Sequence, residues 1–304
     1  MRAIAHIVNP VNVGEESDLF IAQPTTFETM QTAQEFAADR VRVELYSAQY
    51  LEDHLVVPKS FQMTPDLDRS ILDFGVFRIQ RKLPLVRDIL DRLYEATDAE
   101  FLVYTNVDIA LMPHFYLAVD RLISLGYDAF TINRRTISKV YTQTRDIALM
   151  AAQVGEPHPG HDCFVFRRDA YPKYQLEATC IGPPKFDWVL VINLAYHSSE
   201  FRRFEDLHLT FHIGDDRAGK SLGQIDYHLF TEHQLRKVAA HYRPVRSKIS
   251  DSFVREMLGR YSPYPIEAKM YQIKEKLYPI KKQMGSYYRC LANAIRRLAD
   301  RLES

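Results

Sequence analysis

The 304 residues of this chain are enough for one large α/β domain or for two small domains. Lysine plus arginine and aspartate plus glutamate each number 39, so the formal net charge is zero, which argues against a nucleic-acid-binding protein. Eighteen tyrosines and seventeen phenylalanines favour a packed globular chain and argue against disorder.

The cysteines and the amino-terminal residues indicate the cellular compartment of the protein. The three cysteines are an odd number without the spacing of metal ligands, which favours reduced thiols in a cytosolic protein. The apolar run in residues 1–10 is too short for a signal peptide, and no segment approaches the length of a membrane span. We therefore expect a cytoplasmic protein.

The first half of the chain alternates strands with helices, which predicts a mostly parallel sheet with helices on both faces. Residues 48–70 interrupt the alternation and are expected to be irregular, because Pro58 and Pro65 break any helix there. The predicted strands are residues 3–8, 41–47, 101–104 and 128–133. The predicted helices are residues 27–39 with Thr25 or Thr26 as N-cap, residues 85–97 after Pro84, and residues 114–126, which Pro113 opens and Gly126 closes.

The second half is less regular. It contains predicted helices at residues 144–153, 188–195 and 227–241, and predicted strands at residues 162–168 and 207–213. Prolines 244, 263 and 265 mark a boundary, so we expect an α/β domain over residues 1–243 and a helical, basic extension over residues 244–304. In residues 266–304, apolar residues recur at helical spacing among lysines and arginines, which suits either a helix packed on the domain or peripheral contact with an anionic membrane.

The stretch at residues 99–113 is the most informative part of the sequence for locating a functional site. Residues 101–104 suit a parallel strand buried on both faces, and the strand stops at Asn106 and Asp108. Ligands of open α/β sheets bind outside the carboxyl ends of the strands, so Asp108 falls where chemistry is expected. A carboxylate with an amide oxygen two residues before it suits Mg²⁺ or Mn²⁺ carrying a phosphate. The alternative is that Asp108 is a loop residue capping the helix at Pro113.

Further polar stretches end a strand or begin a helix, and each has an ordinary alternative. Asp162 could be a turn residue after a glycine, Asp187 an N-cap, and His212 a hydrogen-bonded core histidine. These stretches are Asn9-Pro10, Gly160-His161-Asp162, Lys185 to Trp188 and His212 to Arg217.

The order of these motifs resembles that of the GT-A-fold glycosyltransferases that use nucleotide-diphosphate sugars. In that family an acidic motif, usually Asp-X-Asp, follows a central strand and holds a divalent metal on the sugar-nucleotide diphosphate. TNVD stands in that place here, with Asp108 as the second acidic residue and Asn106 as a departure at the first. The resemblance covers roughly residues 1–240 and implies a Rossmann-like amino-terminal half.

Three later segments add to this resemblance. GHDCFVFRRD resembles the strand that lines the donor and acceptor sugars, and KFDW resembles the loop that supplies an acceptor-side carboxylate. HIGDDR resembles the late His-X-X-Gly element, which implies that His212 completes the metal shell and that Arg217 contacts phosphate.

The chemistry is coherent from the residues alone. A departing sugar-nucleotide diphosphate needs positive charge, which a metal held by Asp108 and His212 supplies, with Arg217 or Arg78 as a phosphate partner. Arg78 lies in a basic stretch that a solvated face explains equally well. Asp187 and Asp162 are the candidate general bases for the acceptor hydroxyl. Donor-binding candidates are Asn9, Pro10, Arg78, Asn106 and Arg217.

The sequence thus predicts a glycosyltransferase that moves a sugar from a nucleotide-diphosphate sugar to a glycan, a lipid-linked acceptor or a small molecule, with Mn²⁺ or Mg²⁺ as cofactor. A lipid-linked acceptor would place it at the inner face of the membrane. One alternative is a nucleotidyltransferase, although the loop after the first strand is acidic with one glycine instead of basic and glycine-rich. Another is a catalytically degenerate relative that only binds a ligand, which Asn106 keeps open.

Overall fold

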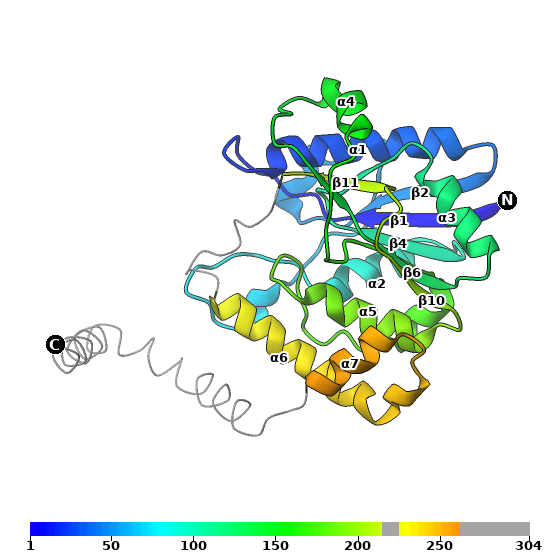
Figure 1. Ribbon diagram of the computed structural model, residues 1–304. Helices are drawn as coiled ribbons and strands as arrows, with labels where there is room; N and C mark the ends of the chain where they lie inside the picture. The colour runs from blue at the N-terminus through cyan, green and yellow to red at the C-terminus, as the bar shows by residue number, and fades with distance from the viewer. Residues whose placement is uncertain (215–224, 262–304) are drawn as a thin grey trace, which may run out of the picture. The chain divides into compact units, whose positions relative to one another are not determined.

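The computed structural model describes residues 1–214 and 225–261, and these form an α/β domain around a seven-stranded sheet in the order β10-β6-β9-β4-β1-β2-β3 (Figure 1). The strands of this sheet are β1 (Arg2–Val8), β2 (Val41–Ser47), β3 (Gln62–Met63), β4 (Phe101–Thr105), β6 (Ala129–Ile132), β9 (Cys163–Arg167) and β10 (Phe201–Phe204). A second, four-stranded sheet contains β5 (Ala110–Leu111), β11 (Thr210–Ile213), β7 (Arg135–Ile137) and β8 (Glu156–Pro157).

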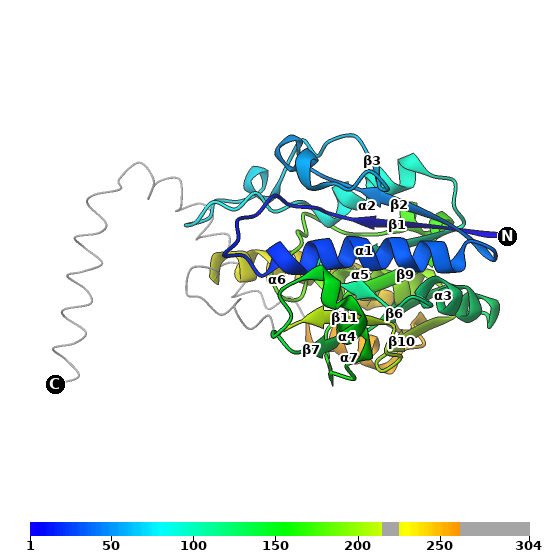
Figure 2. The ribbon, with the colours of Figure 1, turned by 90° about the horizontal axis from the view of Figure 1, so that it is seen from above.

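Helices cover both faces of the large sheet (Figures 1 and 2). Side chains alternate along each strand, so Ile4 and Val103 join one hydrophobic cluster and Ile7 and Leu102 the other. The first cluster includes residues of α1 (Leu19–Ala37) and α3 (Phe115–Ser124), and the second includes residues of α2 (Val86–Ala96), α5 (Phe186–His197), α6 (Ile225–Tyr242) and α7 (Ser252–Arg260). The short helix α4 (Ile147–Ala152) belongs with the smaller sheet's cluster through Met150.

The sheet is mostly parallel, as predicted, and the exception is β9. This strand lies between β4 and β6 and runs antiparallel to both. Its first residue, Cys163, is the register partner of Thr105 at the end of β4 and of Ile132 at the end of β6. The residue before Cys163 therefore lies at the carboxyl ends of two parallel strands.

Most predicted elements are confirmed. The predicted strands at 3–8, 41–47 and 101–104 are β1, β2 and β4, and the predicted helix at 188–195 is α5. The turn after α3 uses Gly126 at φ 103°, a left-handed conformation that glycine adopts without strain.

Two predictions were wrong. The first helix starts at Leu19, with Asp18 as N-cap, so Thr25 and Thr26 are buried inside it and do not cap it. Pro24 lies within this helix and removes one backbone hydrogen bond, which the burial of the face that carries Met30 and Ala33 outweighs. Residues 48–70 are not wholly irregular, since they contain a 3-10 helix, Leu51–Val56, and β3, which pairs with β2.

After residue 243 the chain forms a 3-10 helix, Arg243–Lys248, and then α7. Ile249, Val254 and Leu258 of this segment belong to the same hydrophobic cluster as α5. Arg217 and the predicted basic tail at residues 266–304 lie outside the described residues. Among the described helices, none combines the length and the apolar character that crossing a membrane requires.

Candidate active site

The candidate site lies where β4 and β6 end and β9 begins. Asn106 follows β4, Arg134 follows β6 and Asp162 precedes β9. Asn106 Nδ2 donates to Asp162 Oδ1 at 3.5 Å, and Tyr104 Oη donates to Asn106 Oδ1 at 3.0 Å. The antiparallel insertion of β9 thus brings residues 56 positions apart into contact at the edge where an open α/β sheet binds its ligand.

His212 reaches this edge through the smaller sheet. Its strand, β11, pairs with β5, which directly follows the loop that carries Asp108. His212 Nε2 lies 3.3 Å from Asp108 Oδ2, and the other ring nitrogen, Nδ1, lies 2.9 Å from the carbonyl oxygen of Gly214. A carbonyl oxygen only accepts, so Nδ1 carries a proton and donates it.

Asp162 is the electrostatic centre of the site. Its carboxylate lies 3.3 Å from Arg134 Nη1 and 3.6 Å from His158 Nδ1. Burial raises the pKa of the Asp162 carboxyl to about 6, because Arg134, which lowers it, does not offset the lost hydration. Asp108 and Asp187 raise this pKa further by their negative charge, and His212 lowers it, so all these groups act on one carboxyl.

Asp187 lies in the first turn of α5, where the helix dipole favours negative charge. The N-cap of this helix is Lys185 at φ 74°, without a side-chain capping bond, so Asp187 is not the N-cap. Asp187 Oδ2 instead accepts from His161, with 3.0 Å to the ring Nδ1 and 3.4 Å to the backbone nitrogen. Both side chains are buried, and His161 fixes the position of the carboxylate.

The structure therefore brings Asn106 into contact with Asp162 and His212 into contact with Asp108, and the charges of Asp108, Asp187 and His212 all act on the Asp162 carboxyl. Asp162 is therefore more than a turn residue, and His212 is more than a hydrogen-bonded core histidine, since both lie beside other candidate residues.

The donor-binding candidates are more dispersed. Asn9 directly follows β1 at the same edge of the sheet, where its Nδ2 donates to the carbonyl of Ala48 at 2.6 Å, and Pro10 beside it is buried. Arg78 is exposed, and its backbone N–H donates to Asp226 at the start of α6. Within the described residues 1–214 and 225–261, Asp162 pairs with Arg134 and His158 and not with Arg78, and Arg217 falls in the gap between these ranges.

Sequence reasoning missed Arg134, His158 and His161. Arg134 follows a predicted strand as Asn106 does, so the same signal was present there. His161 was named only as part of the Gly160-His161-Asp162 stretch and was given no role, and His158 stands just before it among glycine and proline residues that indicate a turn.

The fit of a divalent metal depends on Asp108 and His212. In the part of the chain that the structure describes, no three His, Cys, Asp or Glu side chains are grouped as metal ligands. Two ligand atoms are nevertheless suited to a cation. Asp108 Oδ1 is buried without a hydrogen-bond partner among the described residues, and a backbone carbonyl fixes the His212 ring. The residues fit a metal whose remaining ligands come from a bound diphosphate.

Comparison with known proteins shows the fold alone. No family model matches the sequence, and no curated protein matches it. Among solved structures, residues 1–349 of S. aureus TarS in complex with UDP-GlcNAc match with a TM-score of 0.51 at 8% identity, over 85% of this chain and 70% of that chain. The same segment in complex with UDP gives a TM-score of 0.49 at 8% identity, over 85% and 69%. This chain therefore shares its fold with that TarS segment.

Proposed function

We propose that this chain transfers a glycosyl group from a nucleotide-diphosphate sugar to the hydroxyl group of an acceptor. The convergence of Asp108, Asp162, Asp187 and His212 at the ligand-binding edge of a GT-A-type sheet carries the proposal. These residues come from four segments, so locality in the sequence does not force them together. The TarS complex with UDP-GlcNAc favours a uridine diphosphate sugar as the donor.

On the donor side, the negative charge of the diphosphate leaving group must be compensated by positive charge. Asp108 Oδ1 and His212 Nε2 would hold Mn²⁺ or Mg²⁺, which supplies positive charge to the diphosphate when it is bound. Asn106 is hydrogen-bonded to Tyr104 and to Asp162, so it orients the loop after β4 and adds no second negative charge to it. Asn9, Pro10 and Arg217 stay predicted donor contacts. Arg78 is the weakest candidate, because its side chain is exposed and its backbone N–H donates to Asp226.

The acceptor side requires a base. The carboxylate of Asp187, held by His161, takes the proton of the acceptor hydroxyl as its oxygen forms the bond to the anomeric carbon and the bond to the diphosphate breaks. Asp162 is the second candidate, because a carboxyl with a pKa of about 6 is basic enough to accept a proton near neutral pH.

The acceptor and the location of the enzyme complete the proposal. A glycan, a lipid-linked saccharide or a small molecule supplies the hydroxyl, in the cytoplasm or at the inner face of the membrane. Peripheral membrane contact would come from the basic tail at residues 266–304.

Nucleotide binding and turnover separate this proposal from its alternatives. We expect UDP with Mn²⁺ to raise the melting temperature more than either alone, because a ligand that binds only the folded state stabilises it. A panel of UDP sugars and GDP sugars, followed by detection of released nucleoside diphosphate, then tests turnover. Binding without any release would favour a degenerate binding protein, and pyrophosphate release from a nucleoside triphosphate would favour a nucleotidyltransferase.

A further inference from the structure

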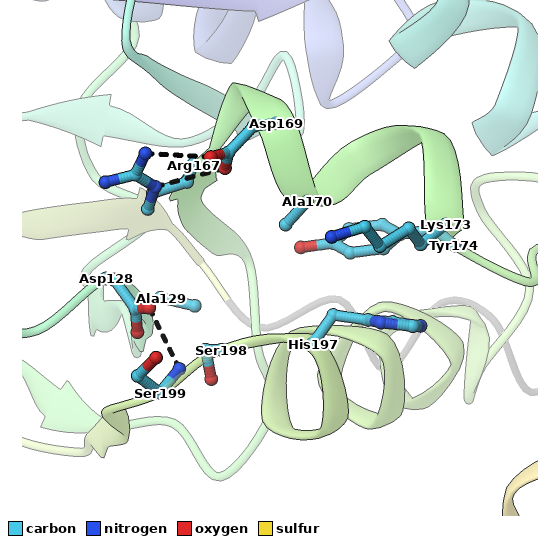
Figure 3. Close-up of a pocket in the computed structure, with 10 residues that line it drawn as sticks. All are labelled: Asp128, Ala129, Arg167, Asp169, Ala170, Lys173, Tyr174, His197, Ser198 and Ser199. Atoms are coloured by element: carbon cyan, nitrogen blue, oxygen red, sulfur yellow. Dashed lines mark hydrogen bonds and ion pairs between the residues drawn. The ribbon is translucent and has the colours of Figure 1, made fainter.

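A polar cavity lies at the end of the large sheet opposite the candidate active site. Figure 3 shows the residues that line it. Its volume is about 300 Å³, at the lower end of the range for small-molecule sites. Asp128 of its wall directly precedes β6, Ser198 and Ser199 precede β10, and Arg167 is the last residue of β9. Because β9 begins beside Asp162 and ends at Arg167, the two sites are separated by about 17 Å, at about 3.4 Å per residue.

Two hydroxyl groups of this wall have no hydrogen-bond partner among the described residues. Tyr174 is 3% exposed, and its Oη is buried and unpaired. Figure 3 shows this oxygen directed toward Ala170, which also lines the cavity. The Tyr174 ring stacks on His197 with 5.6 Å between the ring centroids, so the hydroxyl is held in place. Ser198 Oγ is the second unpaired hydroxyl. A buried hydroxyl without a partner is unfavourable, and a ligand with hydroxyl groups would satisfy both.

The charges of the wall point to a neutral ligand. Arg167 and Asp169 form a bidentate pair, with 3.0 Å from Nε to Oδ1 and 2.8 Å from Nη2 to Oδ2. The Asp128 carboxylate accepts the backbone N–H groups of Ser199 and Glu200 at 2.9 and 2.8 Å. An anionic ligand would meet both carboxylates, and a cationic ligand would meet Arg167 and Lys173.

We propose that this cavity binds one unit of a neutral, hydroxyl-rich molecule, a saccharide or a polyol, at a site separate from the candidate active site. The hydroxyl groups of the ligand donate to Asp128, whose oxygens retain acceptor capacity, and exchange hydrogen bonds with Tyr174 and Ser198. The ammonium group of Lys173 donates to another ligand oxygen. This proposal is independent of the proposed glycosyl transfer and is tested separately.

Saturation-transfer difference NMR on the full chain tests the site, with glucose, N-acetylglucosamine and ribitol as separate probes in the presence of saturating UDP. We expect at least one probe to give a signal, because UDP is present to block the candidate active site and leaves this cavity open. Tyr174→Phe and Lys173→Ala should each weaken its binding at least fivefold. Tyr174→Phe removes a hydroxyl without a partner, so the melting temperature should be unchanged or higher.

Matched variants separate this cavity from the rest of the surface. Tyr127→Phe and Lys59→Ala make the same chemical changes outside the cavity, and Asp108→Asn alters the candidate active site, so all three should keep the signal. The proposal is overturned if no neutral probe binds, or if Tyr174→Phe and Lys173→Ala leave the signal unchanged. Binding of citrate or sulfate that Lys173→Ala removes, without binding of any neutral probe, would instead identify an anion site and overturn it as well.

Discussion

The imidazole Nε2 of His212 lies 3.3 Å from the carboxylate Oδ2 of Asp108, although 104 positions separate the two residues in the chain. Because His212 Nδ1 donates to the Gly214 carbonyl, a neutral ring presents the lone pair of Nε2 to the carboxylate. Two acceptors at this distance repel each other unless a proton or a cation lies with them. The pair is therefore arranged either as an ion pair or as two ligands of one metal ion.

Asp108→Asn tests the second arrangement. The amide retains the size of the side chain but loses the charge, so Mn²⁺ affinity of the UDP-loaded protein should fall by about tenfold or more. Isothermal titration calorimetry measures this without depending on activity. Asp98→Asn is the matched control, because its side chain is fully exposed at 102% and lies outside the site. Equal Mn²⁺ affinity of wild type and Asp108→Asn would exclude Asp108 as a metal ligand.

Asp187→Asn tests the base. Loss of the proton acceptor should lower turnover by about 10²- to 10⁴-fold, the usual contribution of a positioned general base, with little change in UDP affinity. Glycosyl transfer and UDP binding are measured side by side. The same substitution at Asp162 is the comparison, and full turnover of Asp187→Asn together with loss at Asp162→Asn would assign the base to Asp162.

The Asp162 carboxyl predicts a pH-dependent stability. Its pKa is raised from 3.8 to about 6 in the folded protein, so between these values the folded state stays protonated while the unfolded state ionises. Wild-type stability is therefore lost as pH rises through this window, by up to about 3 kcal/mol. Asp162→Asn lacks this titration, so its stability relative to wild type should increase from about pH 4.5 to about pH 7.

Urea unfolding at several pH values measures this difference directly. Asp98→Asn, the same change at a fully exposed side chain, is the matched control. A constant difference between Asp162→Asn and wild type across the window would contradict the raised pKa.

His6 predicts the opposite dependence on pH. It is fully buried between the Tyr116 hydroxyl and the Thr105 hydroxyl, each at 2.9 Å, and burial lowers the pKa of its ring to about 3. Below its ordinary pKa of 6.5 the unfolded state gains a proton that the folded state does not, so stability falls as pH falls.

His6→Leu leaves both hydroxyl groups unpaired and should cost at least about 2 kcal/mol near neutral pH. Since the variant lacks the titration, this deficit should shrink by about 2 kcal/mol between about pH 7.5 and about pH 5. Parallel denaturant titrations at the two pH values measure it. A deficit that stays constant or grows would mean that the His6 ring is protonated in the folded protein.

The sequence by itself determined the elements that depend on interactions between residues close together in the chain. The apolar run that becomes β4, the helical periodicity of α2 and the left-handed glycine at Gly126 each follow from local burial and backbone conformation. The polar residues after β4 and before β9 could also be predicted as site residues from the sequence, because ligands of open α/β sheets bind where the buried strands end.

Only the tertiary structure decided strand direction and pairing. Alternation of apolar and polar residues is the same in either direction, so nothing local made β9 antiparallel or brought Asp162 between the ends of β4 and β6. The contacts of Arg134 and His161 depend on that insertion, and the contact of His212 depends on the pairing of β11 with β5. Burial faces are encoded within a few residues, whereas pairing partners are selected by the packing of the whole chain.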